Sequence, residues 1–123
     1  MQRLCGIVLA ACVIAGVSTA AYANKSAVEI QAPETAKKGS TITISVTVTH
    51  SGNSIVHYTN WVYIKANGKE IARWDFTWNN RPENEVFTRT VTYTVTGPVE
   101  IEAESNCNLH GSAGAKTFQI KVQ

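Results

Sequence analysis

The stretch from Thr41 to His50 alternates strictly between two kinds of side chain. Isoleucines and valines occupy the even positions from 42 to 48, and threonines and one serine occupy the odd positions from 41 to 49. Successive side chains of a β-strand point to opposite faces, so this period of two predicts a strand with one buried face and one face in solvent. His50 continues the phase of the even positions. Its side chain is therefore expected to leave the strand on the core side.

Comparable patterns recur at short spacing along the chain. Further strands are expected near residues 27–31, 57–66, 70–78, 86–95, 99–105 and 116–122. The dipeptide Asn67-Gly68 is a strong signal for a two-residue hairpin turn, and Gly97-Pro98 indicates another turn. No amphipathic helix or internal repeat interrupts the series. About seven short strands predict an all-β fold, an antiparallel immunoglobulin-like sandwich, without the Cys–Trp–Cys framework of antibody domains.

Residues 1–23 have the features of a secretory signal peptide. Arg3 supplies a minimal positive start, the run from Leu4 to Ala20 is apolar, and Ala21-Tyr22-Ala23 is a small-residue cleavage site. We therefore expect residues 24–123 to form one domain that is periplasmic or secreted after cleavage near Ala23. A membrane anchor is an alternative, as is lipoprotein processing at Cys12, because Leu9-Ala10-Ala11-Cys12 resembles a lipobox.

Cleavage after residue 23 would remove two of the three cysteines and leave Cys107 alone in an oxidising compartment. A lone cysteine cannot form an internal disulfide, so stability must come from a core or a bound metal. The whole chain has eleven Lys and Arg against nine Asp and Glu. Loss of Arg3 leaves ten against nine, a net charge near +1. Because no basic run is present, nucleic acid is not an expected partner.

The only cysteine of the expected mature chain belongs to the segment Cys107-Asn108-Leu109-His110-Gly111. A Cys-x-x-His spacing lets a thiolate and an imidazole reach one ion from a single turn, because metal ligands lie about 2.0 to 2.3 Å from the ion. The spacing alone is a weak signal. Cys107 also suits a small buried core position, and His110 also suits a solvated loop.

The two other histidines, His50 and His57, bracket a six-residue loop between two expected strands. Both therefore belong to one end of the sandwich. With His110 and Cys107, all the histidines and the lone cysteine of the expected mature chain fall at strand ends, which favours a mononuclear metal site. Periodicity alone does not place the 107–110 loop at the same end as His50 and His57. A nucleophilic Cys–His pair is an alternative reading of the same residues. The three tryptophans could form a binding surface, but core and cross-strand packing is the simpler role for them: Trp61, Trp74 and Trp78.

Two segments carry a family resemblance. The segment 57–62, His-Tyr-Thr-Asn-Trp-Val, with a histidine shortly before it, resembles the histidine-pair strand of superoxide reductases, the desulfoferrodoxin and neelaredoxin family. The segment 107–111, Cys-Asn-Leu-His-Gly, is similar to that family's C-terminal ligand motif. The resemblance implies an immunoglobulin-like sandwich with a mononuclear non-haem iron centre of four equatorial histidines and one axial cysteine.

By this resemblance His50, His57 and His110 are equatorial ligands and Cys107 is the axial thiolate. Ferrous iron would reduce superoxide to peroxide at the open position, and an electron-donor protein would reduce the iron again. The family's N-terminal Glu-Lys-His segment, which supplies the fourth histidine, is replaced by Asn24-Lys25-Ser26. Lys25 matches the lysine that attracts the anion and is the expected catalytic residue.

Three histidines and one thiolate also suit zinc or copper. The resemblance therefore leaves other functions open: a non-catalytic module that binds iron, zinc or copper, or a metal-free carrier whose Cys107 is modified or persulfidated. Exposed edge strands of such a sandwich leave a homo-oligomer open as well.

Overall fold

The computed structural model describes residues 24–123. The signal peptide expected at residues 1–23, and the lipobox that ends at Cys12, lie outside the described residues. Eight strands follow one another: β1 (Ala27–Gln31), β2 (Thr35–Ala36), β3 (Thr41–Thr49), β4 (Thr59–Ala66), β5 (Lys69–Asp75), β6 (Val86–Thr94), β7 (Val99–Cys107) and β8 (Lys116–Val122). Within residues 24–123 there is no helix long and apolar enough to cross a membrane.

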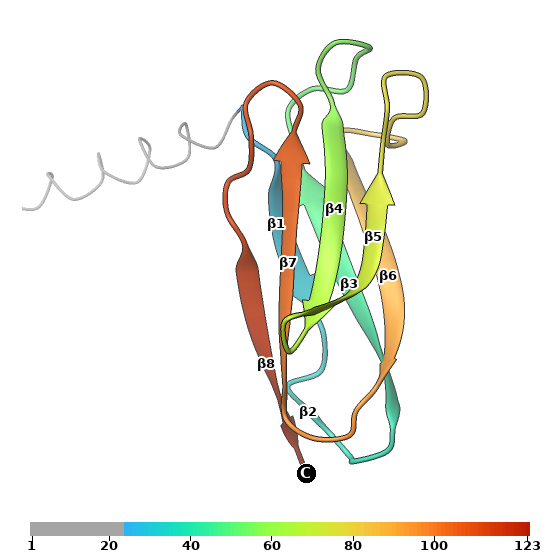
Figure 1. The fold of residues 1–123 in the computed structure, drawn as a ribbon, viewed down its shortest axis with the longest axis vertical. Coiled ribbons are helices and arrows are strands. Elements are labelled where there is room, and N and C mark those ends of the chain that lie inside the picture. The colour runs from blue at the N-terminus through green and yellow to red at the C-terminus, as the bar shows by residue number, and fades with distance from the viewer. Residues whose placement is uncertain (1–23) are drawn as a thin grey trace, which may run out of the picture.

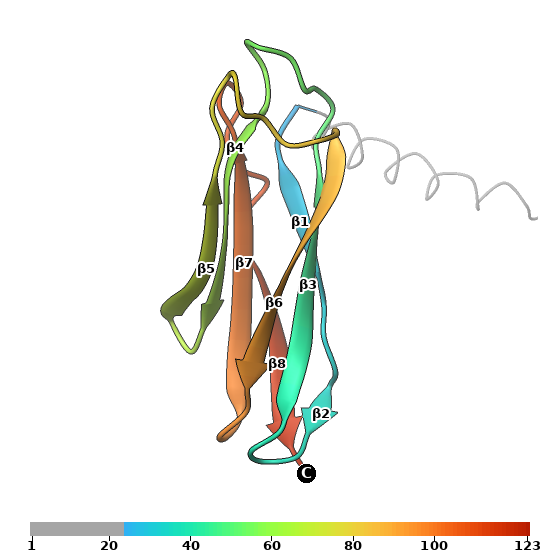
Figure 2. The ribbon, with the colours of Figure 1, turned by 90° about the vertical axis from the view of Figure 1, so that its right-hand side faces the viewer.

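The strands form two sheets that face each other (Figures 1 and 2). One sheet has the order β1-β3-β6, and the other has the order β2-β8-β7-β4-β5. All pairs are antiparallel except that of the two-residue β2 with β8. This arrangement confirms the all-β sandwich, with one short strand more than the sequence pattern indicates. Both sheets are built from residues 27–122, so a chain that begins at Asn24 carries the complete sandwich.

The core lies between the sheets and follows the alternation that the sequence predicts. In β3 the side chains of Ile44, Val46 and Val48 have no exposed area. Their counterparts on the opposing sheet include Ile64 of β4 and Ile101 of β7, which are equally buried. His50 follows β3 directly and is only 3% exposed. The phase of the strand therefore does carry this histidine to the inner side.

Two strand boundaries differ from the sequence expectation for local reasons. The strand expected from residue 57 begins at Thr59, because His57 and Ser54 exchange backbone hydrogen bonds of 3.2 and 2.8 Å in a turn of their own. The strand expected to reach residue 78 ends at Asp75. Beyond it, Thr77 and Asn80 exchange backbone hydrogen bonds of 3.2 and 3.1 Å and form a second turn. His57 is therefore held by a loop and not by the sheet.

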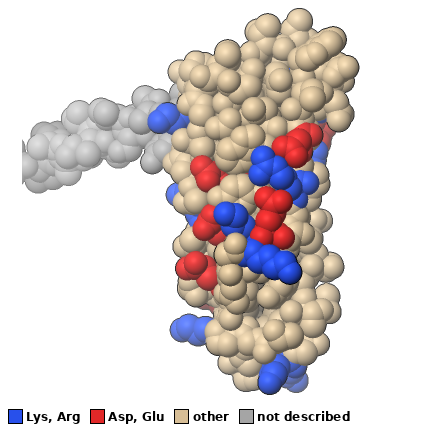
Figure 3. Space-filling model, in the orientation of Figure 1, with Lys and Arg blue, Asp and Glu red and all other residues tan. Residues whose placement is uncertain are grey.

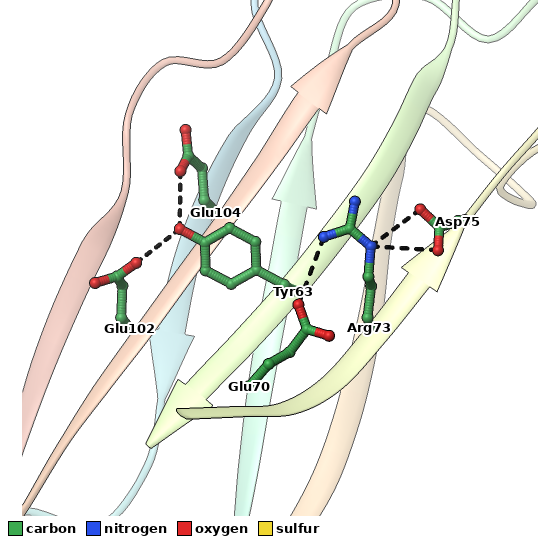
Figure 4. A network of polar contacts seen from close by, with 6 residues as sticks. All are labelled: Tyr63, Glu70, Arg73, Asp75, Glu102 and Glu104. Carbon is green, nitrogen blue, oxygen red and sulfur yellow. Dashed lines mark hydrogen bonds and ion pairs between the residues drawn. The ribbon is translucent and has the colours of Figure 1, made fainter. Parts of the chain in front are cut away.

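A polar network covers the outer face of the larger sheet (Figure 4). The Tyr63 hydroxyl on β4 lies 2.6 Å from Glu102 Oε2 and 2.9 Å from Glu104 Oε1 on β7. Arg73 on β5 pairs with Asp75 at 3.1 Å and with Glu70 at 3.5 Å. Burial of the phenol, followed by its hydrogen bonds to the two carboxylates, raises the pKa of Tyr63 well above its usual range.

Replacement of Tyr63 by phenylalanine should cost about 1 kcal/mol of unfolding free energy, since both carboxylates regain water when the hydroxyl is lost. Urea unfolding measures this cost. Alkaline titration at the phenolate absorbance should show one tyrosine of the wild type ionising far above the ordinary value of about 10. That component should vanish in Tyr63→Phe and persist in Tyr93→Phe. Its persistence in Tyr63→Phe would contradict the assignment.

Candidate metal centre

The predicted ligands converge at one end of the sandwich, the upper end in Figure 1. His50 immediately follows β3, Cys107 is the last residue of β7, and His57 lies two residues before β4. Thr59, the first residue of β4, pairs with Cys107, so the ladder between these strands places the thiol beside the segment that carries His57. His110 follows Cys107 in a turn closed by backbone hydrogen bonds of 2.9 and 3.0 Å between Cys107 and Gly111.

The ligating atoms of His50, His57 and Cys107 all lie within 4.8 Å of one another. His110 Nδ1 lies 3.2 Å from His57 Nε2 and 3.8 Å from Cys107 Sγ. Atoms bonded to one ion at about 2.0 to 2.3 Å are themselves separated by about 3 to 4.5 Å. His50, His57 and Cys107 are therefore spaced nearly as the ligands of a single ion, and His110 contacts two of these three through Nδ1.

The imidazole of His50 lacks the partners that a buried ring normally has. Neither Nδ1 nor Nε2 makes a hydrogen bond, although both atoms are buried. Buried polar atoms are nearly always satisfied, so an unpartnered ring beside a thiol and a second imidazole fits a metal ligand. Burial, followed by the charge of His57, lowers the pKa of His50, while the backbone of Gly52 and the charge of Glu85 act in the opposite direction. The neutral form that a metal requires is thereby favoured.

Comparison with known proteins places this centre in a family. The sequence model of the desulfoferrodoxin family matches residues 18–114, which is most of the chain. The chain belongs to the desulfoferrodoxin family. This membership confirms the resemblance carried by the segments 57–62 and 107–111. The β-sandwich is that of an iron-binding domain similar to superoxide reductase, and its His/Cys cluster could hold a metal ion.

Solved structures agree with the family assignment. The superoxide reductase (neelaredoxin) from Ignicoccus hospitalis is 25% identical, with a TM-score of 0.66, over 87% of this chain and 86% of that one. The sulfur carrier protein SoxY from Chlorobium limicola f thiosulfatophilum is 14% identical, with a TM-score of 0.56, over 77% and 74% of the two chains. At that identity the likeness to SoxY shows the shared fold alone. No curated protein sequence matches the chain.

Asn108 joins the two ligand segments of this desulfoferrodoxin domain. Its Oδ1 accepts a hydrogen bond of 2.9 Å from the N–H of Tyr58, and its Nδ2 donates one of 3.2 Å to the carbonyl of Val56. Its own N–H donates to the Tyr58 carbonyl at 3.1 Å. The turn between Cys107 and His110 is thus fixed to both neighbours of His57. Sequence reasoning missed this role, although Asn108 stands inside the ligand motif.

Gly52 is a second residue that the sequence did not single out. Its φ of +151° lies outside the range that other residues usually adopt. A Cβ at this position would lie 2.5 Å from Nδ1 and 2.7 Å from Cε1 of His57. The imidazole of His57 therefore lies directly against the backbone of Gly52. This contact fixes the ring from behind while Nε2 faces the other ligands.

Ser26 stands where the family's histidine would stand, but its side chain is inside the protein. It has no exposed area, and its Oγ lies 2.9 Å from Thr59 Oγ1 and 2.7 Å from Ser105 Oγ. Its N–H donates to the carbonyl of Gly111 at 3.2 Å. Lys25, the expected catalytic residue, immediately precedes it and is exposed. The backbone thus brings Lys25 to the metal end without supplying a ligand from residue 26.

Introduction of a histidine at Ser26 should not complete the centre. The imidazole would overfill a closed site and leave the hydroxyls of Thr59 and Ser105 without their partner, at a cost of about 2 to 4 kcal/mol of unfolding free energy. Urea unfolding and iron titration of Ser26→His measure both effects. Asn24→His, at an exposed position nearby, is the matched control and should keep wild-type stability. Tighter iron binding by Ser26→His at unchanged stability would contradict the burial of residue 26.

Proposed function

We propose that the chain is an exported iron protein that reduces superoxide to hydrogen peroxide. The observation that carries this proposal is the meeting of four potential ligands from two separate loops, one of them the buried and unpartnered ring of His50. In this proposal His50, His57 and His110 hold one iron ion through nitrogen, and Cys107 holds it through sulfur. Membership of the desulfoferrodoxin family selects iron. Zinc and copper, which the donor set alone admits, gain no such support.

The reaction consumes one electron and two protons for each superoxide, and it yields hydrogen peroxide. A ferrous ion held by His50, His57, His110 and Cys107 would supply that electron, and an electron-donor protein would replace it. The chain itself orients the ligands and favours the neutral form of His50. The N–H of His110 donates to Cys107 Sγ at 3.4 Å, a contact that joins the two ligands of this turn.

Lys25 is proposed to attract the substrate. Superoxide is an anion, and Lys25 is an exposed cation that adjoins the segment bonded to Gly111, directly after His110. Charge at such a position raises the rate of encounter with a small anion and loses its effect as salt rises. Neutralisation in Lys25→Gln should therefore reduce the second-order rate constant with superoxide while iron binding is kept. The export expected from residues 1–23 would place this activity in the periplasm or outside the cell.

The test has two stages. Protein produced with iron under reducing conditions should bind about one iron per chain, measured by metal analysis. Rapid mixing with superoxide should then give decay that accelerates in proportion to bound iron and produces peroxide. Iron without accelerated decay would refute the reductase and support a second candidate, a non-catalytic iron-binding module. The burial of Ser26, which leaves the centre without a fourth histidine, favours that candidate. Absence of stoichiometric iron would refute both.

A further inference from the structure

The large hydrophobic side chains that are exposed in residues 24–123 gather at one end of the molecule. Five such residues are between 52% and 64% exposed: Ile55, Val56, Trp78, Val86 and Leu109. Three belong to the two loops that carry the metal ligands, Trp78 belongs to the loop after β5, and Val86 pairs with Thr49 at the end of β3. All five therefore lie at the metal end. Soluble domains normally scatter single exposed apolar residues, so this concentration indicates a surface that is covered in use.

The same end is almost free of charge. The stretches 50–58, 76–80 and 105–115 contain no Asp, Glu, Lys or Arg. Figure 3 shows the upper end of this face without acidic or basic side chains, while both kinds form a belt across the middle. Asp75 and Arg81 flank the second stretch, Glu104 and Lys116 flank the third, and Lys25 precedes Ser26 at the same end. We define the apolar tip as Ile55, Val56, Trp78 and Leu109, the four exposed large hydrophobic residues of the three uncharged stretches.

The chain enters the sandwich at this tip. Ser26 donates its N–H to Gly111, and the N–H of Ala113 donates to the Ser26 carbonyl at 2.9 Å, so residues 24–26 are anchored beside His110. Directly before them the sequence runs from Leu4 to Ala20 without a charged residue. A segment of that composition engages a membrane whether it is later cleaved or kept. As long as this segment is attached, its junction with Asn24 keeps the tip, and not the opposite end, next to the bilayer.

We propose that the apolar tip docks on a lipid bilayer surface. Tryptophan and aliphatic side chains that project from loops suit the boundary between lipid headgroups and acyl chains. There an indole keeps its N–H in the polar layer. The attraction comes from apolar burial, because the tip has no basic cluster. Docking in this way turns the metal end of the sandwich, with the exposed His110, toward the membrane interface.

Vesicle binding tests the proposal. Residues 24–123, which carry the complete sandwich, are mixed with phosphatidylcholine vesicles and sedimented. We expect the wild type to sediment with the vesicles equally at low and high salt. The double variant Ile55→Ser/Val56→Ser should partition at least tenfold less, since burial of one such side chain is worth about a factor of ten. The matched control is Lys37→Ser/Lys38→Ser, exposed residues of the turn before β3, which should bind as the wild type does.

Quenching of tryptophan fluorescence by brominated lipid gives a second readout that does not depend on the double variant. Quenching should occur in the wild type and be lost in Trp78→Phe, which keeps Trp61 and Trp74. No sedimentation of the wild type, or equal quenching in Trp78→Phe, overturns the proposal. A dimer in solution that the Ile55→Ser/Val56→Ser variant dissociates, without vesicle binding, also overturns it and assigns the tip to a second copy of the chain.

Discussion

Replacement of Cys107 by serine is expected to lower iron affinity by more than 100-fold and to remove the thiolate-to-ferric charge-transfer band of the oxidised protein. Loss of a partner that merely orients a ligand costs about 10- to 100-fold in metal affinity, and loss of a ligand costs more. Cys107 is buried, with 1% of its surface exposed. Because serine is nearly isosteric with cysteine, the fold should nevertheless survive the substitution. Iron titration and the visible spectrum measure the two effects.

Leu109→Ala is the matched control for Cys107→Ser. Leu109 lies in the same turn, is exposed and has no ligating atom, so its loss should leave both iron affinity and the spectrum intact. Urea unfolding of the metal-free proteins should show that both variants are folded. Wild-type iron affinity with an unchanged spectrum in Cys107→Ser would show that Cys107 is not a ligand, and only the three histidines would remain as candidates.

Replacement of Gly52 by alanine is expected to weaken iron binding by about 10- to 100-fold, although residue 52 has no ligating side chain. The new Cβ would lie 2.5 Å from His57 Nδ1, so the imidazole or the backbone must shift from its present position. Iron titration measures the loss. Unfolding should also become easier by about 1 to 3 kcal/mol, because alanine is strained at a φ of +151°.

Gly68→Ala separates these two effects. Gly68, in the hairpin between β4 and β5, also has a positive φ, of +81°, but a Cβ there meets no atom within 4 Å. This control carries backbone strain far from the metal end. Gly68→Ala should therefore lose stability and keep iron affinity. If the two glycine variants lost iron affinity equally, the contact between Gly52 and His57 would have no role in orienting the ring.

The local sequence pattern was sufficient to predict the β-sandwich and the inward position of His50. The alternation of apolar and polar residues in β3 shows which face of the strand meets the core, and ten consecutive residues are enough to establish it. The same phase carried His50 inward, where it has no hydrogen-bond partner. The position of His57 was less predictable, because a bonded turn with Ser54, rather than strand propensity, decides where β4 begins.

Contacts between distant segments could not be read from the sequence. Asn108 bonds to Tyr58 across fifty positions, and Ser26 bonds to Ser105 across seventy-nine. Neither partner choice has a local signal, because a polar side chain at a strand end suits solvent equally well. The apolar tip could not be predicted from the sequence for the same reason. Ile55, Trp78 and Leu109 are unremarkable one by one, and only the packing of three loops brings them together.

The two ends of the described chain lie at opposite ends of the sandwich (Figure 1). Asn24 enters beside the metal ligands, while Gln123 bonds through its N–H to Ala36 at the far end. The choice of terminus for a fusion therefore decides whether the fused segment interferes with measurements at the metal end. A purification tag ahead of Asn24 would place its own imidazoles next to the iron ligands and compete for the ion. A tether at Gln123 would instead leave the metal end free and facing away from the support.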